Sequence, residues 1–357
     1  MTDISKRKAD HLDLAESGDV GFRRTTTLFE CVRLVHDALP ELAVEELDTS
    51  VTLLGKRLSA PLLIAGMTGG HERARSINRE LASIAEERGY AFGLGSQRAL
   101  HLRPETRASY AVRDVAPNAL VLGNVGMVQA ARMTTAEVED LVGQVGADAL
   151  CVHLNPAMEL VQDDGDRDFR AGLETLARLC QELSVPVVAK ETGSGLSASV
   201  GVRVRAAGVR HVDVSGAGGT SWVAVEMHRA SPERRPLGET FREWGIPTAA
   251  SVALVSPLGF ETVFATGGIQ SGLDVAKAIA LGATAAGIAR PVLQALDRGG
   301  RPGALEWLVR IETELKTAML LTGARDLGAL RAAPRVILGE LAEWIRQLSP
   351  SLKRRSV

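Results

Sequence analysis

Two segments in the last third of the chain have the composition of a phosphate-binding site. Short apolar runs end in Thr266-Gly267-Gly268-Ile269 and in Gly287-Ile288-Ala289-Arg290, and a helical pattern follows each of them. Glycine lets the backbone approach an anion closely, and a helix N-terminus presents free N–H groups and the positive end of the helix dipole. The alternative is two tight turns of purely structural origin. We predict a phosphate site formed by Gly267, Gly268, Ile269, Ala289 and Arg290.

A glycine-rich loop and a lysine are further candidates for the same ligand. The loop at 213–222 contains Ser215 and Thr220, and its hydroxyl and N–H groups can donate to a phosphate. Lys190 ends another apolar run in a chain with only seven lysines. Such a lysine can stabilise negative charge on the N1/O2 edge of a reduced flavin. The alternative is a salt bridge with Glu191 or another carboxylate.

Polar or glycine residues also follow three earlier apolar runs. Among them, the guanidinium of Arg98 can hold a phosphate through a bidentate contact. Each residue taken alone is more often a satisfied turn residue, but together they indicate one polar rim. The residues are Met67, Thr68, Gly69, Ser96, Gln97, Arg98 and Asn124.

The segment after residue 152 combines an imidazole, an amide and carboxylates. His153 and Asn155 lie on the same face of an extended segment, so both can reach one pocket. Glu159 can hold a Mg²⁺ ion that bridges a diphosphate, because Mg²⁺ prefers oxygen ligands and retains waters. The acidic run 163–168 is alternatively a solvated loop.

The elements that must position these residues read as alternating strands and helices. The apolar runs lack polar alternation, as expected for parallel strands covered on both faces. They lie at 61–66, 91–95, 119–124, 148–154, 185–190, 210–215, 261–267 and 284–288, with helical patterns at 74–88, 134–145, 168–183 and 272–281. No GxGxxG follows the first run, so the pattern favours a (β/α)8 TIM barrel in the α/β class over a doubly wound sheet.

Length and composition bound the remaining possibilities. The 357 residues suffice for one large domain, and we expect a barrel over 61–297, an N-terminal extension over 1–60 and a C-terminal helical cap over 298–357. A net charge of −2 gives no reason to expect nucleic acid or an acidic membrane as partner. The three cysteines are scattered, the N-terminus is polar rather than signal-like, and no apolar stretch is long enough for a membrane span. We therefore expect a soluble, cytoplasmic protein.

The motifs, read in order, resemble those of the type 2 isopentenyl-diphosphate isomerase family. The series is RKxDH, MTGG, GSQR, HLNP, KETG, GAGGTSW, ATGGI and GIAR, from Arg7 to Arg290. The resemblance implies an FMN-dependent interconversion of isopentenyl and dimethylallyl diphosphates, with Mg²⁺ on the diphosphate. It also implies that NADPH or NADH reduces the flavin, and that the chain forms a homo-oligomer, usually a tetramer or octamer.

The resemblance also assigns roles to individual residues. FMN is expected to meet Met67, Thr68, Gly69, Ser96, Asn124, Lys190, Ser215 and Thr220, and its phosphate the five residues named above. The diphosphate is expected to meet Arg7, Lys8, Arg98, His153 and Asn155, with Glu159 as metal ligand. His11 and Gln97 are expected in the same site, Trp222 and Glu226 over the substrate, and the catalytic set is His11, His153, Met158 and Lys190.

Met158 departs from the family pattern, which has glutamine there beside the substrate hydrocarbon. A thioether has no titratable proton and is a weak hydrogen-bond acceptor. Gln162, four residues later, takes similar space if the segment is helical. Two alternatives follow: a flavin and prenyl-diphosphate binding protein with altered or lost activity, or an FMN-dependent oxidase or dehydrogenase of hydroxy acids on a related barrel.

Overall fold

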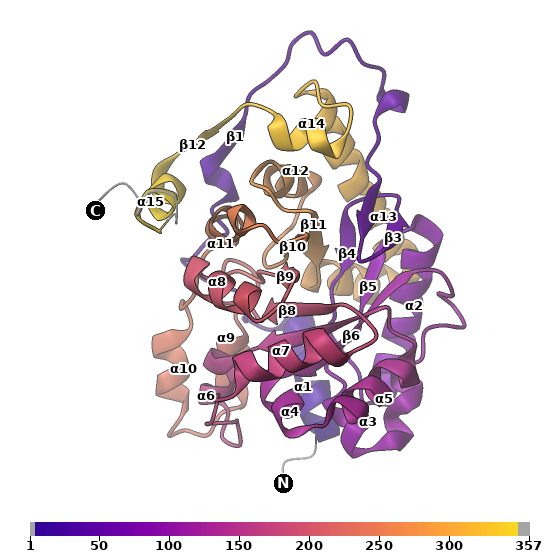
Figure 1. Cartoon of the computed structure of the whole chain (residues 1–357), viewed down its shortest axis with the longest axis vertical. Helices are drawn as coiled ribbons and strands as arrows, with labels where there is room; N and C mark the ends of the chain where they lie inside the picture. The colour runs from indigo at the N-terminus through magenta and orange to yellow at the C-terminus, as the bar shows by residue number, and fades with distance from the viewer. Residues whose placement is uncertain (1–3, 349–357) are drawn as a thin grey trace.

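A closed barrel of eight parallel strands forms the centre of the molecule (Figure 1). The computed structural model describes residues 4–348, and the side chains of all of these except residues 4–9 and 17. The barrel strands are β4 (Leu62–Ile64), β5 (Ala91–Gly93), β6 (Leu120–Gly126), β7 (Ala149–Leu154), β8 (Val187–Glu191), β9 (His211–Asp213), β10 (Thr262–Ala265) and β11 (Ala285–Ile288). Pairing of β11 with β4, with Ala286 opposite Leu62, closes the ring. The predicted fold class is confirmed, and every strand lies within or within two residues of its predicted run.

The helices between these strands surround the barrel. The predicted helices are confirmed as α2 (Glu72–Arg88), α5 (Thr135–Val145), α7 (Gly172–Glu182) and α12 (Gly272–Ala280), joined by α8 (Ala198–Ala206) and α11 (Thr248–Val255). Thr134 and Ser271 cap α5 and α12 by accepting from the N–H groups of Glu137 and Asp274. The capping residues therefore begin these helices where the sequence pattern places them.

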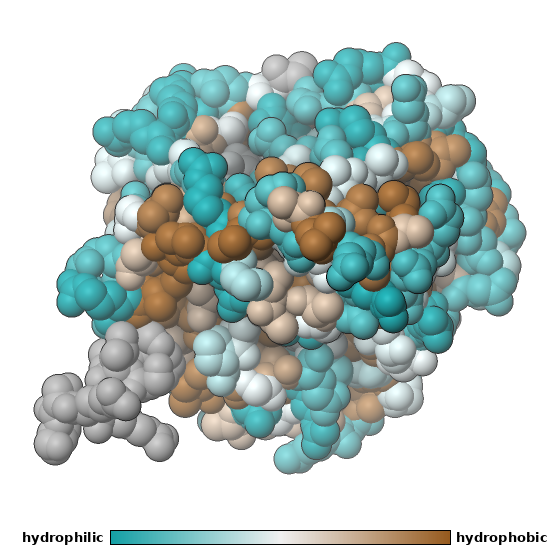
Figure 2. Space-filling model, turned by 90° about the horizontal axis from the view of Figure 1, so that it is seen from above, coloured by the Kyte–Doolittle hydropathy of each residue, from teal (hydrophilic) through white to brown (hydrophobic). Residues whose placement is uncertain are grey.

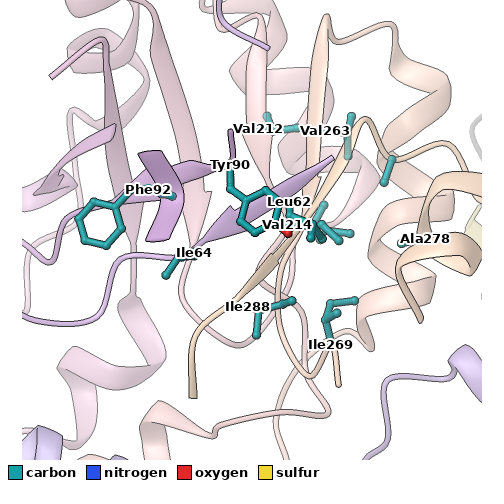
Figure 3. Close-up of a cluster of buried hydrophobic side chains, with 14 of the residues drawn as sticks. Leu62, Ile64, Tyr90, Phe92, Val212, Val214, Val263, Ile269, Ala278 and Ile288 are labelled. Atoms are coloured by element: carbon teal, nitrogen blue, oxygen red, sulfur yellow. The ribbon is translucent and has the colours of Figure 1, made fainter. Parts of the chain in front are cut away.

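The core lies between the barrel and its helices. Figure 3 shows Leu62, Ile64, Val212 and Val263 from three strands gathered with Ala278 of α12, and each of these side chains is buried. A second cluster, with Leu63, Leu122 and Phe264, lies apart from it. Strands covered on both faces explain why the sequence shows apolar runs and no alternation.

Short helices follow several strands at the carboxyl end of the barrel. They are α3 (Arg98–Leu102), η3 (Pro104–Ser109), α4 (Met127–Arg132), α6 (Pro156–Val161), α9 (Trp222–Arg229) and α10 (Arg235–Phe241), whereas η4 (Ser256–Leu258) follows α11 and leads into β10. Helix α1 (Ile4–Ser17) packs against α9 and α13 and lies at the lower edge of Figure 1, near the label N.

Segments from both ends of the chain meet outside the barrel. Strand β1 (Val32–Leu34) pairs antiparallel with β12 (Arg335–Ile337), and β2 (Val51–Leu53) forms a hairpin with β3 (Lys56–Leu58). The remaining elements are η1 (Phe29–Cys31), η2 (Val44–Glu46), α13 (Arg290–Leu320), α14 (Leu327–Ala332) and α15 (Gly339–Leu348). The sequence did not predict β1 to β3 or β12, because runs of three residues carry no readable period. The expected boundary at 297–298 falls inside α13, close to its kink at Gly300.

No helix within residues 4–348 has both the length and the apolar character needed to cross a bilayer. Figure 2 shows hydrophobic side chains in short patches between hydrophilic ones on the face seen from above the view of Figure 1.

Candidate active site

One cavity of about 560 Å³ opens at the carboxyl ends of the barrel strands. Its wall is formed by residues that follow all eight strands and by side chains of α1. This is the end at which barrel enzymes place their catalytic residues. The volume falls within the range of small-molecule sites.

The turns after β10 and β11 form a cradle made of backbone. Gly267 and Gly268 have φ values of +99° and +76°, which disfavour any residue with a Cβ. A Cβ on Gly219 would lie 2.4 Å from the Gly268 nitrogen, so two backbones approach each other closely here. Within the described chain, the N–H groups of Gly268, Ile269 and Ala289 donate to no backbone acceptor. These groups are therefore available to an anion.

Arg290 connects this cradle to the N-terminal helix. Its side chain lines the cavity, and it donates from Nε to the Ala15 carbonyl at 2.7 Å and from Nη2 to the Gly18 carbonyl at 2.8 Å. Burial lowers the pKa of Arg290 from its ordinary value, although the guanidinium remains charged. The cradle thus gains a fixed cation that also holds the end of α1.

A buried ion pair lies beside the cradle. Lys190 Nζ is 2.8 Å from Asp213 Oδ2, and Asp213 Oδ1 accepts from Thr266 Oγ1 at 2.6 Å and from the Ser215 N–H at 3.2 Å. Ser215 has a positive φ of 38°, an uncommon conformation for a serine. Lys190 therefore forms a salt bridge, which was the alternative to a role at a flavin. Its partner is Asp213 and not Glu191.

The opposite side of the cavity is made of side chains that contact one another. His153 Nδ1 lies 2.8 Å from Asn124 Oδ1. The Asn155 amide donates to Glu159 Oε1 at 2.9 Å, and Glu159 Oε2 accepts from the Asp166 N–H at 2.8 Å. Both carboxylate oxygens of Glu159 have a donor, and each keeps a further lone pair for a cation.

A second network reaches the cavity from α1, α6 and α9. The side chain of Glu226 is 1% exposed. Its Oε1 lies 2.7 Å from His11 Nε2 and accepts a hydrogen bond from the Gln162 amide at 3.1 Å. Its Oε2 pairs with Arg229 Nη1 at 2.8 Å. His11 also packs edge-on against Trp222, with ring centroids 5.4 Å apart. The network joins three segments that are far apart in the sequence.

Met158 and Gln162 both line the cavity. Residues 156–161 form helix α6, and Gln162 is its C-terminal capping residue. The segment is therefore helical, which is the condition under which the sequence predicts that Gln162 takes space similar to that of the family glutamine. The Met158 sulfur lies 3.7 Å from the Asn155 amide nitrogen and has no charged partner.

The remaining predicted residues divide into three groups. Met67, Ser96, Arg98 and Thr220 line the cavity. Thr68, Gly69 and Gln97 do not. Arg7 and Lys8 belong to helix α1, but their side chains lie outside the described residues.

The three residues that do not line the cavity support its wall. Gln97 is fully buried, donating to the Leu141 carbonyl at 2.7 Å and accepting from the Asn124 N–H at 2.9 Å. Thr68 Oγ1 lies 3.1 Å from His71 Nε2, and a Cβ on Gly69 would clash with the Tyr110 ring at 2.0 Å. Direct contact of Gln97 with a ligand would therefore require a rearrangement that breaks its hydrogen bonds to Leu141 and Asn124.

Several residues of the site were not selected from the sequence. Asp213, Thr266 and Gly219 entered the sequence analysis only as members of longer motifs, and Phe22 was not a candidate. Thr266, Gly219 and Phe22 line the cavity. A buried carboxylate at a strand end was the available signal for Asp213, because burying an acid without a partner is costly. No sequence signal identifies Phe22, which reaches the cavity from a loop before the barrel.

The described residues contain no cluster of three or more histidine, cysteine or acidic side chains able to hold a metal by themselves. Glu159 is the acidic side chain at the cavity wall, with Asn155 beside it. A single carboxylate of this kind suits Mg²⁺ that takes its other ligands from a phosphate and water.

The sequence was compared with protein families and with known proteins. The family model described as FMN-dependent dehydrogenase matches residues 2–152 and 154–336. An isopentenyl-diphosphate delta-isomerase of Methanothermobacter thermautotrophicus is 45% identical over 345 residues, covering 96% of each chain. Enzymes of the same name from Synechococcus sp. and Halobacterium salinarum are 46% and 44% identical, covering 92% and 98% of this chain and 95% and 98% of their own.

Solved structures with the same fold are more distant in sequence. A mandelate oxidase variant with an FMN adduct has a TM-score of 0.65 at 18% identity, covering 91% of this chain and 95% of its own. A flavocytochrome b2 variant has a TM-score of 0.67 at 18% identity, covering 99% of this chain and 85% of its own. At this identity the likeness concerns the fold alone. The extent and level of the sequence matches show that the chain belongs to the FMN-dependent, type 2 isopentenyl-diphosphate delta-isomerase family.

Proposed function

We propose that this protein interconverts isopentenyl diphosphate and dimethylallyl diphosphate on reduced FMN. The observation that carries the proposal is that one cavity joins a backbone phosphate cradle to an opposite wall of cationic and hydrogen-bonding side chains. A flavin needs the first feature, and a substrate with its own diphosphate needs the second.

The residues present fit FMN. Gly267, Gly268, Ile269, Ala289 and Arg290 would hold its phosphate, since all five line the cavity and the N–H groups of Gly268, Ile269 and Ala289 have no backbone acceptor within the described chain. Lys190 would meet the pyrimidine edge of the ring. Met67, Ser96, Asn124, Ser215 and Thr220 would complete the contacts, with Thr68, Gly69 and Gln97 supporting them.

The opposite wall suits a diphosphate. Arg98 lines the cavity and has no carboxylate partner among the described residues, so an anion would gain a bidentate contact. His153 and Asn155 lie beside it, and Arg7 and Lys8 on α1 would add charge. We assign Glu159 to a Mg²⁺ ion carried by the diphosphate.

Moving a double bond requires a proton to be added at one carbon and removed at another. Reduced FMN, when bound, supplies a proton donor and acceptor at the alkene. The chain contributes the network of His11, Gln162 and Glu226, which can hold a proton at Glu226 Oε1 or His11 Nε2. Met158 beside them adds apolar surface.

The cavity wall also keeps water away from the reacting carbons. Leu12 of α1 is 3% exposed, and with Phe22 and Trp222 it covers the cavity on the side of the second network. An apolar cover of this kind protects a cationic intermediate from water. We assign Trp222 and Glu226 to the substrate cover, as the resemblance implied.

We extend the proposal to the setting of the reaction. NADPH is the reductant that keeps the flavin reduced. The whole chain acts as one FMN-binding domain in the cytoplasm, and the free state of all three cysteines is typical of a reducing compartment.

We also propose that the chain is a homo-oligomer. An apolar groove of about 1410 Å³ beside α6, α7 and α10 includes Phe241 and Trp244, and the Trp244 side chain is 62% exposed. An apolar groove with exposed aromatic side chains is typical of a protein–protein interface. Light scattering should give a tetramer or octamer, and Trp244→Glu should give smaller species; a monomeric parent protein would contradict the assignment.

An anaerobic assay tests the main proposal. Purified protein with FMN, NADPH, Mg²⁺ and isopentenyl diphosphate should form dimethylallyl diphosphate, and omission of FMN or Mg²⁺ should abolish it. Tight substrate binding without product would instead establish a binding protein that has lost activity. Flavin reduction by a hydroxy acid would support the oxidase alternative.

A further inference from the structure

Asp213 is a buried carboxylate that no assignment above uses. Its side chain is 2% exposed and lies at the end of β9. It contacts Lys190, Thr266 and Ser215, which all line the cavity, while Asp213 itself does not. The carboxylate is therefore one layer behind the surface that a cofactor would touch.

The two oxygens of this carboxylate have separate tasks. Oδ1 accepts from the Thr266 hydroxyl at 2.6 Å and the Ser215 N–H at 3.2 Å, so the plane of the carboxylate is fixed from two sides. Oδ2 lies 2.8 Å from Lys190 Nζ. The positive φ of Ser215, at 38°, accompanies the N–H contact and shows that the backbone adopts an uncommon conformation at this point.

The arrangement restricts the lysine in position and in charge. Lysine is a flexible point charge with several rotatable bonds, so an unanchored ammonium would not stay at one place. A carboxylate at 2.8 Å fixes it. The same carboxylate opposes the positive potential that the ammonium creates in the cavity, because the two charges largely cancel at a distance.

We propose that Asp213 is a positioning residue that sets the electrostatic potential at the flavin through Lys190. It holds the ammonium at the cavity wall and, as its counter-charge, limits how strongly that ammonium favours negative charge on the flavin ring. The inference rests on the proposed function only for the placement of FMN beside Lys190.

Sulfite affinity measures this potential without turnover. Sulfite donates its electron pair to N5 of oxidised flavin, and the resulting negative charge spreads to the N1/O2 edge, so a stronger positive potential there tightens the adduct. Asp213→Asn keeps an oxygen acceptor for Lys190 but removes the charge. We expect sulfite to bind at least about tenfold more tightly to this variant, with the FMN dissociation constant changed less than about threefold.

The effect must depend on Lys190. Lys190→Met should weaken sulfite binding at least about tenfold. Asp213→Asn should then tighten it clearly less than in the parent, because the direct effect of the lost charge remains but there is no ammonium left to release. An equal tightening in both backgrounds would show that the carboxylate acts on the flavin directly, and would overturn the positioning role. Unchanged sulfite affinity in the single Asp213→Asn variant would overturn it as well.

A matched control is available at the other end of the barrel. Asp148 pairs with Lys56 at 2.7 Å and with Arg113 at 2.6 Å, remote from the cavity wall. Asp148→Asn removes a comparable carboxylate and should leave sulfite affinity unchanged. An equal shift in Asp148→Asn would mean that loss of a charge pair anywhere is sufficient, which would contradict the proposal.

Thr266→Val keeps the test decisive if Asp213→Asn does not fold. Loss of the hydroxyl donor leaves more negative charge on Asp213 to oppose Lys190, so sulfite should bind a few-fold more weakly; tighter or unchanged binding would overturn the proposal. A parent protein that binds no FMN would refute the proposed function. Normal FMN binding with unresponsive sulfite affinity would refute this inference alone.

Discussion

The two sides of the cavity are built from different materials. The phosphate cradle after β10 and β11 consists of backbone, with Gly267 and Gly268 at positive φ and free N–H groups. The second network consists of side chains from α1, α9 and the end of α6 that bond to one another, with Glu226 at the centre. The first is fixed by local conformation, whereas the second depends on segments that meet only in the folded protein.

The two sides should therefore differ in the amino-acid substitutions that they tolerate. The cradle should be insensitive to most substitutions that spare its glycines, because a backbone N–H does not depend on residue type. The side-chain network should tolerate methionine in place of glutamine at position 158, because Gln162 still donates a hydrogen bond to Glu226. Cofactor binding and turnover should therefore fail separately.

The largest expected effect comes from the cradle. A Cβ at Gly268 would lie 2.4 Å from Thr27 Cγ2 and 2.9 Å from the Gly218 carbonyl carbon, at a φ that already disfavours alanine. Gly268→Ala should cost on the order of 3 kcal/mol of FMN affinity, or about 100-fold. Flavin titration of the apoprotein measures it. Gly143→Ala, where a Cβ meets nothing within 4 Å, is the control and should bind FMN normally.

The next effect should appear in turnover alone. Glu226→Gln removes the negative charge that pairs with Arg229 and lies beside His11, and leaves one acceptor oxygen in place of two. Loss of a charged hydrogen bond of roughly 2 kcal/mol should lower kcat about 30-fold in the anaerobic assay. FMN affinity should stay within about threefold. A large loss of FMN would contradict the separation of the two sides.

Gln162 and Met158 sharpen the comparison within the network. Gln162→Leu leaves Glu226 Oε1 without its amide donor and should lower kcat about tenfold. Met158→Gln should change kcat by less than about threefold in either direction, because Gln162 already donates a hydrogen bond to Glu226. A large gain from Met158→Gln would show that the methionine limits the rate.

The smallest effect concerns stability and not activity. Burial raises the pKa of Glu191 to about 8, while Ser194 and Gly195 donate their N–H groups to its Oε2. A raised folded-state pKa means that this group stabilises the fold fully below about pH 4.5 and loses that contribution as the pH rises toward 8.

Glu191→Gln retains an acceptor oxygen and cannot ionise. Urea unfolding at pH 5 and pH 8 should show that the variant loses less stability than the parent across this interval, by at least about 1 kcal/mol. Parallel pH dependence of the two proteins would place the Glu191 pKa outside the interval.

The cradle was predictable from the sequence because its signals are local. The glycine pair Gly267-Gly268 after one apolar run and Gly287 in the last run mark the two turns, and the eight runs indicate the barrel and its cavity end. The partner of Lys190 was not predictable, because Asp213 and Glu191 are both acids near strand ends and only the strand register decides between them. The bonds of Glu226 were not predictable either, since His11 lies 215 residues away.

The pairing of β1 with β12 has a consequence for how the protein is made. Val32 lies opposite Ile337, so the segment that carries Gly21 and Phe22 to the cavity is anchored by a strand about three hundred residues later in synthesis. Closing so long a loop is entropically unfavourable until the intervening barrel has formed. We therefore expect this pairing to form late in folding. A nascent chain that lacks β12 would hold Gly21 and Phe22 only through their bonds to other parts of the chain, such as that of Phe22 to Gly219.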